Sequence, residues 1–448
     1  MVATFRPRTA ILFLGDVFFF TLALWLTLYL RSFVLPTGEQ FLLHLFPFSL
    51  LFAVWVGIFF IAGLYESRYI ILARRALSEA LMVAQVINVC IAALFFFFIP
   101  LFVIAPKTIL FIYLIVSFFS VLFWRGWLFP MFRREREQAV MVGEGTEAKE
   151  LSVAFRDAHR APVIIVESLN PSTPGLSERI KKATIEHHAR FVIADFDHPA
   201  VSAAFPELYN LVVRGVRFMD LPAVYEEVFG RVPLSRVDSR WVARNVSSSA
   251  HVLYDTLKRI IDIAVSTVLG PVSLILYPFI IFAIKVEDGG PAIISMPRVG
   301  EGGRPFSFYK FRSMSGNDKG EYGVDGTTKL RVTRVGRFLR AGRLDELPQL
   351  WNVLRGNLSL IGPRPEFPPL VALYEKEIPY YSLRHLIKPG LSGSAQLYYH
   401  GDPHHMADVE ATRMKFSYDL FYLKHRSLTL DLSIILKTVR RLLIKSNS

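Results

Sequence analysis

The chain of 448 residues has a single cysteine, Cys90, which lies in an apolar run. A lone cysteine excludes a disulfide framework and a cysteine-based metal site within one chain. Charged residues are also scarce, at 20% against 52% hydrophobic residues, and this composition is too apolar for an ordinary soluble enzyme. Acidic residues are the rarer charged type: the chain has 38 aspartates and glutamates and 51 lysines and arginines, and its formal net charge is +13. Such an excess favours anionic lipid on the cytoplasmic side of a membrane. The alternative partner of a basic chain, nucleic acid, is disfavoured by the amount of apolar sequence.

Four long apolar segments lie before residue 130. Residues 9–30, 41–64, 80–104 and 108–128 each reach the ~20 residues that a helix needs to cross a bilayer. The first segment lacks a small-residue cleavage pattern, so we expect it to be retained. Basic residues flank alternate ends of these segments, whereas the other loops carry only Arg31 and Lys107. The positive-inside rule therefore places the N-terminus and everything after residue 130 in the cytoplasm.

Residues 137–235 alternate between short apolar strands and helical stretches. The strands at 139–143, 162–166 and 191–194 predict a parallel, doubly wound, Rossmann-like sheet. The turn at 143–148 fits the nucleotide-binding pattern G-x-G-x-x-A. However, Glu144 and Glu147 in this turn would repel a pyrophosphate. Nucleotide binding and a docking or regulatory role both stay open.

A fifth apolar run, at about residues 258–285, predicts a helix that enters the membrane and returns to the same face. Pro271 and Pro278 interrupt the run, and an interior proline removes a helix hydrogen bond. Lys258 and Lys285 flank it, so both ends prefer the cytoplasm. We expect a break near Pro271 or Pro278. An ordinary fifth span is the alternative, and it would put the polar C-terminal half outside.

Two adjacent carboxylates, Asp345 and Glu346, precede an apolar pattern of helical spacing over residues 344–354. The pattern predicts that both acids open a helix, where the helix dipole favours an ionised carboxylate. An ionised, partly desolvated aspartate is a competent nucleophile toward phosphorus and a natural ligand for Mg²⁺ shared with a diphosphate. The residues alone leave open the alternative that both acids only stabilise the first helical turn.

Cationic residues surround this pair in the sequence. From residue 327 to 344 there is no acid, and five arginines there have a spacing of three, which predicts a cationic stripe on a helix. We expect most of them to meet solvent or lipid headgroups, and Arg343, beside the acids, to meet a diphosphate. Four further cations stand among glycines and prolines suited to phosphate binding: Lys310, Arg312, Arg364 and Lys388.

Four motifs occur together: KFRSM at 310–314, LDELPQL at 344–350, GPRP at 362–365 and KPG at 388–390. In this order and spacing they resemble the bacterial sugar transferase family, the polyprenyl-phosphate hexose-1-phosphate transferases or large monotopic phosphoglycosyl transferases. The resemblance covers nearly the whole chain. It implies a membrane α plus α/β architecture. Its parts are a four-helix transmembrane bundle (1–130), a Rossmann-like cytoplasmic domain (137–235) and a mostly helical monotopic catalytic domain (250–448) with a re-entrant helix.

The resemblance also implies a reaction at the bacterial inner membrane. A sugar 1-phosphate passes from a UDP-sugar to undecaprenyl phosphate, UMP leaves, and exopolysaccharide, capsule or O-antigen synthesis begins. Family members use the aspartate that matches Asp345 as the nucleophile, Glu346 matches the second member of the dyad, and Mg²⁺ binds beside them. Lys310, Arg312, Arg364 and Lys388 match positions expected to contact phosphates or nucleotide.

This sequence departs from the family pattern at a few positions away from the dyad. Tyr277 stands before Pro278 where the family has serine, so the hydroxyl that would support the helix break is missing, and Ser273 is a candidate substitute. Two functions from other classes compete with the transferase: a catalytically silent membrane nucleotide sensor and an assembly scaffold. A homodimer is a further expectation, and the sugar is not indicated.

Overall fold

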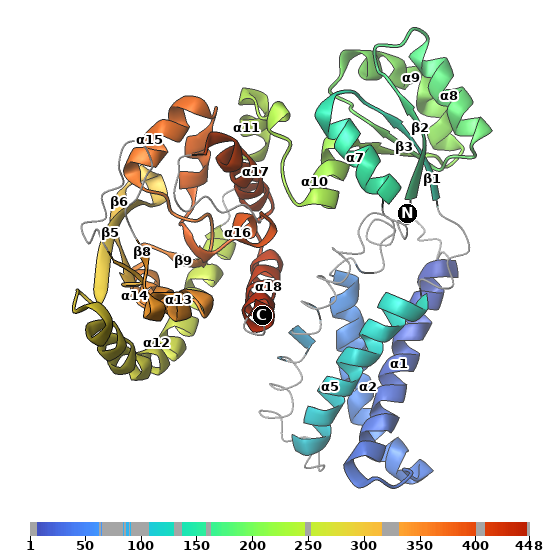
Figure 1. The fold of residues 1–448 in the computed structure, drawn as a ribbon. Coiled ribbons are helices and arrows are strands. Elements are labelled where there is room, and N and C mark those ends of the chain that lie inside the picture. Colours follow the sequence, from blue (N-terminus) through green and yellow to red (C-terminus); the bar gives the residue numbers. More distant parts are fainter. Residues whose placement is uncertain are drawn as a thin grey trace. The chain divides into compact units, whose positions relative to one another are not determined.

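The computed structural model of the protein describes residues 7–61, 64, 84, 87–88, 90, 107–129, 137–157, 163–246, 252–315, 331–399 and 408–445. The chain divides into two compact units, Met1–Phe229 and Gly230–Ser448 (Figure 1). The first contains apolar helices and an α/β domain. The second contains the Asp345–Glu346 pair.

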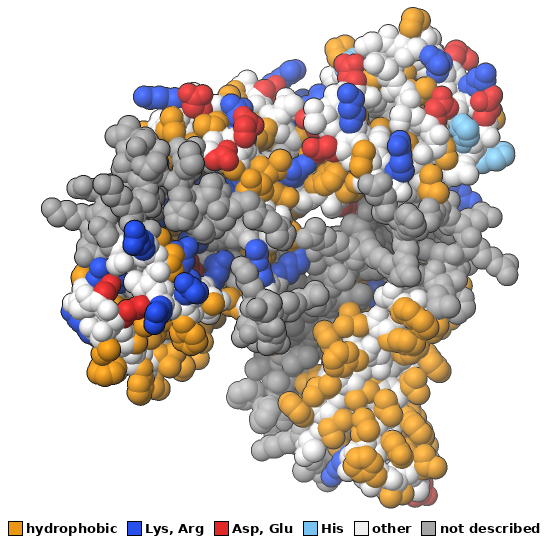
Figure 2. Space-filling view, in the orientation of Figure 1, with side chains coloured by type: hydrophobic (Ala, Val, Ile, Leu, Met, Phe, Trp, Pro, Cys, Tyr) orange, Lys and Arg blue, Asp and Glu red, His pale blue; other side chains and the backbone are white. Residues whose placement is uncertain are grey.

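The apolar helices are α1 (Pro7–Ser32), α2 (Gly38–Ile61) and α5 (Lys107–Phe123), which continues as a π-helical turn, η1 (Trp124–Leu128). Helix α1 packs against α2 and α5. In their core the Trp55 ring meets Phe20 edge to face, with 5.2 Å between the ring centroids, and stacks on Tyr113 at 5.5 Å. Figure 2 shows the outer faces of these helices covered by hydrophobic side chains. Three of the four expected spans are thus helices long and apolar enough to cross a membrane. The remaining one, 80–104, falls largely outside the described residues.

A buried ion pair connects α1 to the end of α5. Nε of Arg125 donates to Oδ1 of Asp16 at 2.7 Å, and Nη1 donates to the carbonyl of Leu64 at 3.1 Å. Both charged side chains are at most 1% exposed. Arg125 is one of the basic residues at the end of the fourth apolar segment, but it lies inside the helix cluster, where Asp16 supplies its counter-charge.

The α/β domain is a three-layer sandwich around a parallel sheet of strand order β2-β1-β3-β4. The strands are β1 (Glu137–Val142), β2 (Val163–Leu169), β3 (Phe191–Ala194) and β4 (Arg217–Asp220). Alternate residues of β1 face opposite layers, as a strand requires. Ala139 and Met141 pack under α7 (Gly145–Asp157) and α10 (Leu221–Phe229), whereas Val140 and Val142 pack under α8 (Leu176–Glu186) and α9 (Pro199–Val213). The expected parallel sheet with alternating helices is therefore present.

The second unit combines helices with short strands. Its helices are α11 (Ser239–Asn245), α12 (Val252–Asp288), α13 (Arg334–Ala341), α14 (Gln349–Arg355), α15 (Pro368–Glu377), α16 (Ser394–Tyr398), α17 (Val409–His425) and α18 (Leu428–Lys445). Its strands form three pairs: antiparallel β5 (Ile293–Val299) with β6 (Pro305–Phe311), antiparallel β7 (Met314–Ser315) with β8 (Arg331–Val332), and parallel β9 (Ser359–Ile361) with β10 (Gly390–Ser392). Short helical turns are η2 (Leu234–Arg236), η3 (Glu301–Gly303), η4 (Leu344–Glu346) and η5 (Tyr381–Leu386). Val232 and Leu234 pack into the core of this unit, together with Tyr381, Phe416 and Leu420.

Helix α12 passes through both Pro271 and Pro278 without leaving helical conformation, and Figure 1 shows it bent rather than interrupted. The expected break is thus a bend in a continuous helix. The Ser273 hydroxyl donates to the Gly270 carbonyl at 2.7 Å. This bond does not replace the one that Pro278 removes, because that proline deprives the carbonyl of Leu274 of its donor.

Both ends of α12 bind the same unit. Near its start, Arg259 donates to the carbonyls of Val353 and Leu354 in α14 at 2.6 and 2.7 Å. At its end, Glu287 accepts from the first two amides of α13, at 2.6 and 3.0 Å. The stretch between is largely exposed and apolar, with Val268, Val272, Ile275 and Phe279 between 56 and 71% exposed. The bent middle of α12 therefore projects an apolar surface from a unit that holds both of its ends (Figure 2).

Candidate functional site: a carboxylate pair among paired cations

Asp345 and Glu346 lie in the tight turn η4, one turn ahead of α14 rather than within its first turn. Arg343 precedes them in the left-handed conformation (φ 53°), which ends the course of α13. The expected arginine stripe is consequently divided, because α13 stops at Ala341. Pro348 is the residue before α14, where its missing amide hydrogen breaks no helix bond.

Asp345 is buried, with 5% of its side chain exposed, and it faces Lys310 of β6. Nζ of Lys310 lies 3.3 Å from Oδ2 of Asp345. Burial lowers the pKa of Lys310 below its usual value, although Asp345 and Glu346 oppose the change. Among the described residues, Oδ1 of Asp345 makes no hydrogen bond to a side chain or backbone group. One carboxylate oxygen is thus balanced by a cation and the other has no protein partner in the described part of the chain.

Glu346 is held by two arginines from different segments. Nη1 of Arg343 lies 3.4 Å from Oε2, and both terminal nitrogens of Arg364 lie 3.4 Å from Oε1. Burial would raise the pKa of Glu346, but Arg364, Arg343 and Lys310 outweigh it and the pKa is lowered. The glutamate is therefore kept ionised beside Asp345.

Arg312 lies apart from the carboxylate pair. Its Nη1 contacts Asp288, the last residue of α12, at 3.2 Å, and its Nε donates to the carbonyl of Met314. A side chain at Gly290 would overlap the Arg312 guanidinium and displace it. The structure thus gives Arg312 a role in fastening the end of α12 to the β5–β6 hairpin.

Lys388 faces the C-terminal end of α14. A Cβ added to Gly356, which has φ +86°, would lie 3.9 Å from Nζ of Lys388 and 3.5 Å from Nη2 of Arg259. Neither cation has an acidic partner within 4 Å among the described residues. Lys388 was predicted from its place in a motif, whereas the contact of Arg259 was not predictable, because nothing in a local pattern tells which helix end a distant arginine will reach.

The structure therefore brings together Lys310, Arg343 and Arg364 around Asp345 and Glu346, and it places Arg312 and Lys388 in other surroundings. Three cations around two carboxylates leave a net positive charge when both acids are ionised. Such a site favours a further anion, and guanidinium and ammonium groups are the usual phosphate donors in proteins.

A profile of the bacterial sugar transferase family matches residues 253–445. The chain is also 40% identical over 203 residues to the UDP-glucose:undecaprenyl-phosphate glucose-1-phosphate transferase of Caulobacter vibrioides, covering 73% of that relative and 44% of this chain. The chain belongs to the bacterial sugar transferase family. The resemblance that the four motifs indicated is confirmed.

Two longer relatives match over less of their length. The UDP-N-acetylgalactosamine-undecaprenyl-phosphate N-acetylgalactosaminephosphotransferase of Aeromonas hydrophila is 40% identical over 223 residues, which are 49% of this chain and 51% of that relative. The undecaprenyl-phosphate glucose phosphotransferase of Komagataeibacter xylinus is 29% identical over 337 residues, 71% of this chain and 61% of the relative. The chain thus spans about half the length of the Aeromonas relative, and the relatives' names include two different sugars.

Proposed function

We propose that this bacterial sugar transferase transfers a sugar 1-phosphate from a UDP-sugar to undecaprenyl phosphate and releases UMP. The observation that carries the proposal is the buried Asp345, 3.3 Å from Lys310, next to a glutamate held by two arginines. The relatives' names agree with it, since they specify transfer of a phosphosugar to this lipid phosphate.

The first step is attack of an Asp345 carboxylate oxygen on the β-phosphorus of the donor. A new oxygen–phosphorus bond forms, the bond from the β-phosphorus to the bridging oxygen breaks, and UMP leaves with its electron pair. The sugar stays on the phosphate as an aspartyl-phosphosugar. Lys310, Arg343 and Arg364 would stabilise the negative charge on the phosphate oxygens as it redistributes.

The second step returns the enzyme to its starting state. A phosphate oxygen of undecaprenyl phosphate attacks the same phosphorus, and the bond to Asp345 breaks. The products are the lipid-linked diphosphosugar and a free carboxylate. This ping-pong order lets one small site serve a soluble donor and a lipid acceptor in turn.

Mg²⁺ is part of the proposal, and the residues present fit it. Mg²⁺ commonly binds through one or two carboxylates and substrate phosphates rather than an all-protein cage. Among the described residues no group of three or more acids, histidines or cysteines could hold a metal. Asp345, whose Oδ1 is unengaged in that part of the chain, would supply a ligand, with Glu346 beside it. When bound, the ion would neutralise diphosphate charge.

We further propose that the protein lies in the bacterial inner membrane with the α/β domain and the Gly230–Ser448 unit on the cytoplasmic face, and that α12 is re-entrant. Two observations support this placement. Both ends of α12 bind the same unit, while a straight helix of 37 residues would extend about 55 Å. In Figure 2, lysine and arginine side chains lie next to the exposed apolar bend, as expected at a headgroup boundary.

The transferase is tested by measuring UMP release with Mg²⁺, undecaprenyl phosphate and a panel of UDP-sugars. We expect UMP rather than UDP from one donor, because the sugar keeps its β-phosphate. Without the lipid, about one equivalent of UMP per protein should appear, as a covalent intermediate requires. Asp345→Ala should release none, whereas Asp255→Ala, a change at a half-exposed acid of α12, should retain activity. UDP as the product, or an active Asp345→Ala, would refute the mechanism.

The re-entrant topology is tested with single cysteines. In a Cys90→Ser background, Thr256→Cys and Val286→Cys mark the two ends of α12. A membrane-impermeant thiol reagent should label both in inverted vesicles and neither in right-side-out vesicles. Labelling from opposite sides would show that α12 crosses the membrane.

A further inference from the structure

The turn that carries Arg364 is fixed by its backbone. It runs from Gly362 to Glu366 and contains two prolines, which have no amide hydrogen to donate. Four successive carbonyl oxygens of the turn each accept a hydrogen bond from another part of the unit. The donors, in order from Pro363 to Glu366, are the amide of Gly390 (2.9 Å), the guanidinium of Arg384 (2.9 Å), the guanidinium of Arg298 (3.1 Å) and the amide of Val299 (2.9 Å).

Among these donors, Arg384 is the one whose bond reaches the residue that touches the carboxylate pair. Its Nη2 donates to the carbonyl of Arg364, and the side chain of Arg364 contacts Oε1 of Glu346 at 3.4 Å. A shift of the Arg364 backbone would move its guanidinium, because the side chain is anchored at that Cα.

The side chain of Arg384 is itself fixed by two further contacts. It is 6% exposed, it donates to the hydroxyl of Tyr381, and it forms an ion pair with Asp419 of α17 at 2.9 Å. Asp419 is also buried, at 3% exposed. A charged pair this far from solvent gives little net stability compared with apolar residues of similar size, so stability alone is a weak reason for its presence.

We propose that Arg384, held by Asp419, positions Arg364 against Glu346 and thereby sets the rate of sugar-phosphate transfer. Arg384 touches neither carboxylate of the pair, so it acts through Arg364 as a positioning residue. The inference rests on the proposed function, because the rate in question is that of the transferase.

The chain offers a matched control in Arg413. Like Arg384, it donates to a backbone carbonyl, that of Glu377, at 2.6 Å and pairs with an acid, Glu410, at 3.2 Å. Glu377 is the last residue of α15, and Arg364 does not belong to that helix. Arg413 and Glu410 are more exposed, at 38 and 85%, so Arg413→Met removes a carbonyl clamp of the same kind but from a more open site, away from the carboxylate pair.

The experiment measures UMP release and thermal unfolding of the full chain in detergent for Arg384→Met, Arg384→Lys and Arg413→Met. A displacement of about 1 Å at a reacting group can reduce the rate roughly 100-fold, so we expect Arg384→Met to lower kcat/KM by about 10- to 100-fold. Lysine should restore part of the rate, and Arg413→Met should leave it within about threefold. The double variant Arg384→Met/Asp419→Asn removes the unpaired buried acid, so it should unfold near the wild-type temperature while remaining slow.

Coupling to Arg364 separates positioning from a general structural role. If Arg384 acts through Arg364, Arg384→Met should cause little further loss in an Arg364→Met background, because effects through a shared partner do not add. Equal losses in both backgrounds, or wild-type rates in the double variant with Asp419→Asn, would overturn the inference and leave the transferase intact. Absence of UMP release from the wild type with any donor would instead overturn the proposed function and this inference with it.

Discussion

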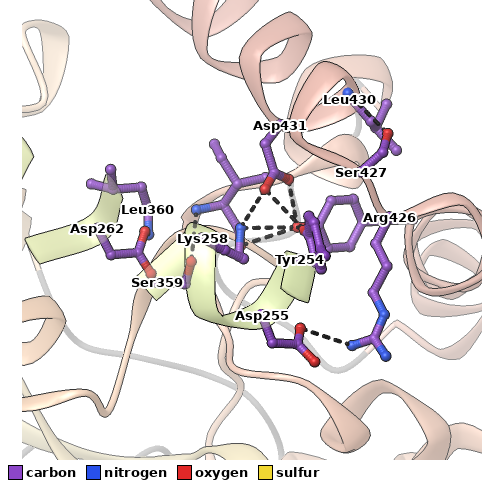
Figure 3. A network of polar contacts seen from close by, with 12 residues as sticks. Tyr254, Asp255, Lys258, Asp262, Ser359, Leu360, Arg426, Ser427, Leu430 and Asp431 are labelled. Carbon is purple, nitrogen blue, oxygen red and sulfur yellow. Dashed lines mark hydrogen bonds and ion pairs between the residues drawn. The ribbon is translucent and has the colours of Figure 1, made fainter. Parts of the chain in front are cut away.

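Replacing Asp431 with asparagine should loosen the attachment of α12 to α18. In Figure 3, the Asp431 carboxylate accepts hydrogen bonds from Lys258 and Tyr254, which lie near the start of α12. Nζ of Lys258 lies 2.8 Å from Oδ2, and the Tyr254 hydroxyl donates to the same oxygen at 2.9 Å. Tyr422 of α17 donates to Oδ1 at 2.7 Å. Asparagine keeps the shape of the side chain but leaves the Lys258 ammonium without its counter-charge.

The expected size of the effect follows from burial. The side chains of Lys258 and Asp431 are 15 and 9% exposed, and removing one partner of a buried ion pair costs about 3 kcal/mol or more. Since each 1.4 kcal/mol is a factor of ten in an equilibrium constant, local opening should become roughly 100-fold more frequent. The same α12 segment offers a control in Asp255, whose pair with Arg426 at 3.5 Å leaves the aspartate 52% exposed. Exposed pairs contribute less than about 1 kcal/mol.

Hydrogen–deuterium exchange followed by mass spectrometry measures this opening locally. Peptides from α18 and the first turns of α12 should exchange about 100-fold faster in Asp431→Asn and within about fivefold of wild type in Asp255→Asn. Peptides from β1 and α7 belong to the other unit and should be unchanged in both. Equal exchange rates in the two variants would show that burial does not determine how much free energy the Lys258–Asp431 pair contributes.

Three other outcomes are expected. Since burial lowers the pKa of Lys310, the rate of UMP release should begin to fall at a pH below the usual lysine pKa of about 10.5. Lys310→Arg should shift this fall to higher pH. The same alkaline pH dependence in both proteins would argue against the Lys310–Asp345 pair. Gly336→Ala would place a Cβ against the Ser313 carbonyl and should destabilise the unit by about 1–3 kcal/mol. Gly270 in α12 has open space around it, so Gly270→Ala should be neutral or stabilising by up to about 1 kcal/mol. Melting temperatures measured in detergent compare the two variants. Burial raises the pKa of Asp419 to about 6, although Arg384 opposes it, so the folded protein binds a proton that the unfolded chain releases above about pH 4. The contribution of Asp419 to stability should therefore fall as pH rises from about 4 to 6, and this fall in melting temperature with pH should be absent from Asp419→Asn. Burial lowers the pKa of His385 to about 4, which gives the opposite pH dependence. That effect is common to both proteins and cancels when they are compared.

Elements whose pattern is local were predictable from the sequence. The parallel sheet follows from short apolar strands separated by helical stretches, and the three described N-terminal helices follow from their length and apolarity. The carboxylate pair was found because the acids, the proline and the apolar spacing all lie within about ten residues. Its exact secondary structure was missed: a left-handed Arg343 ends the preceding helix and puts the acids in a separate turn.

Partners that come from distant segments could not be predicted. The sequence shows that Arg312 is cationic and near glycines, but its partner Asp288 depends on how α12 ends. Arg384 gave no signal, because a buried arginine and a surface arginine are identical in a sequence. The expected break at Pro271 or Pro278 became a bend, since a helix can lose one or two backbone bonds and continue.

The Asp16–Arg125 pair has a consequence for how the chain is made. The two residues are 109 positions apart, and at about 5–20 residues per second a ribosome needs roughly 5–20 s to cover that distance. During this time Asp16 is already synthesised and Arg125 is not, although an acid within an apolar helix is costly in a bilayer. We therefore expect helix α1 to stay near the membrane surface until α5 has been synthesised. Helices α1 and α5 would then enter the bilayer together, with Asp16 and Arg125 already paired, and α1 would insert later than its position in the chain suggests.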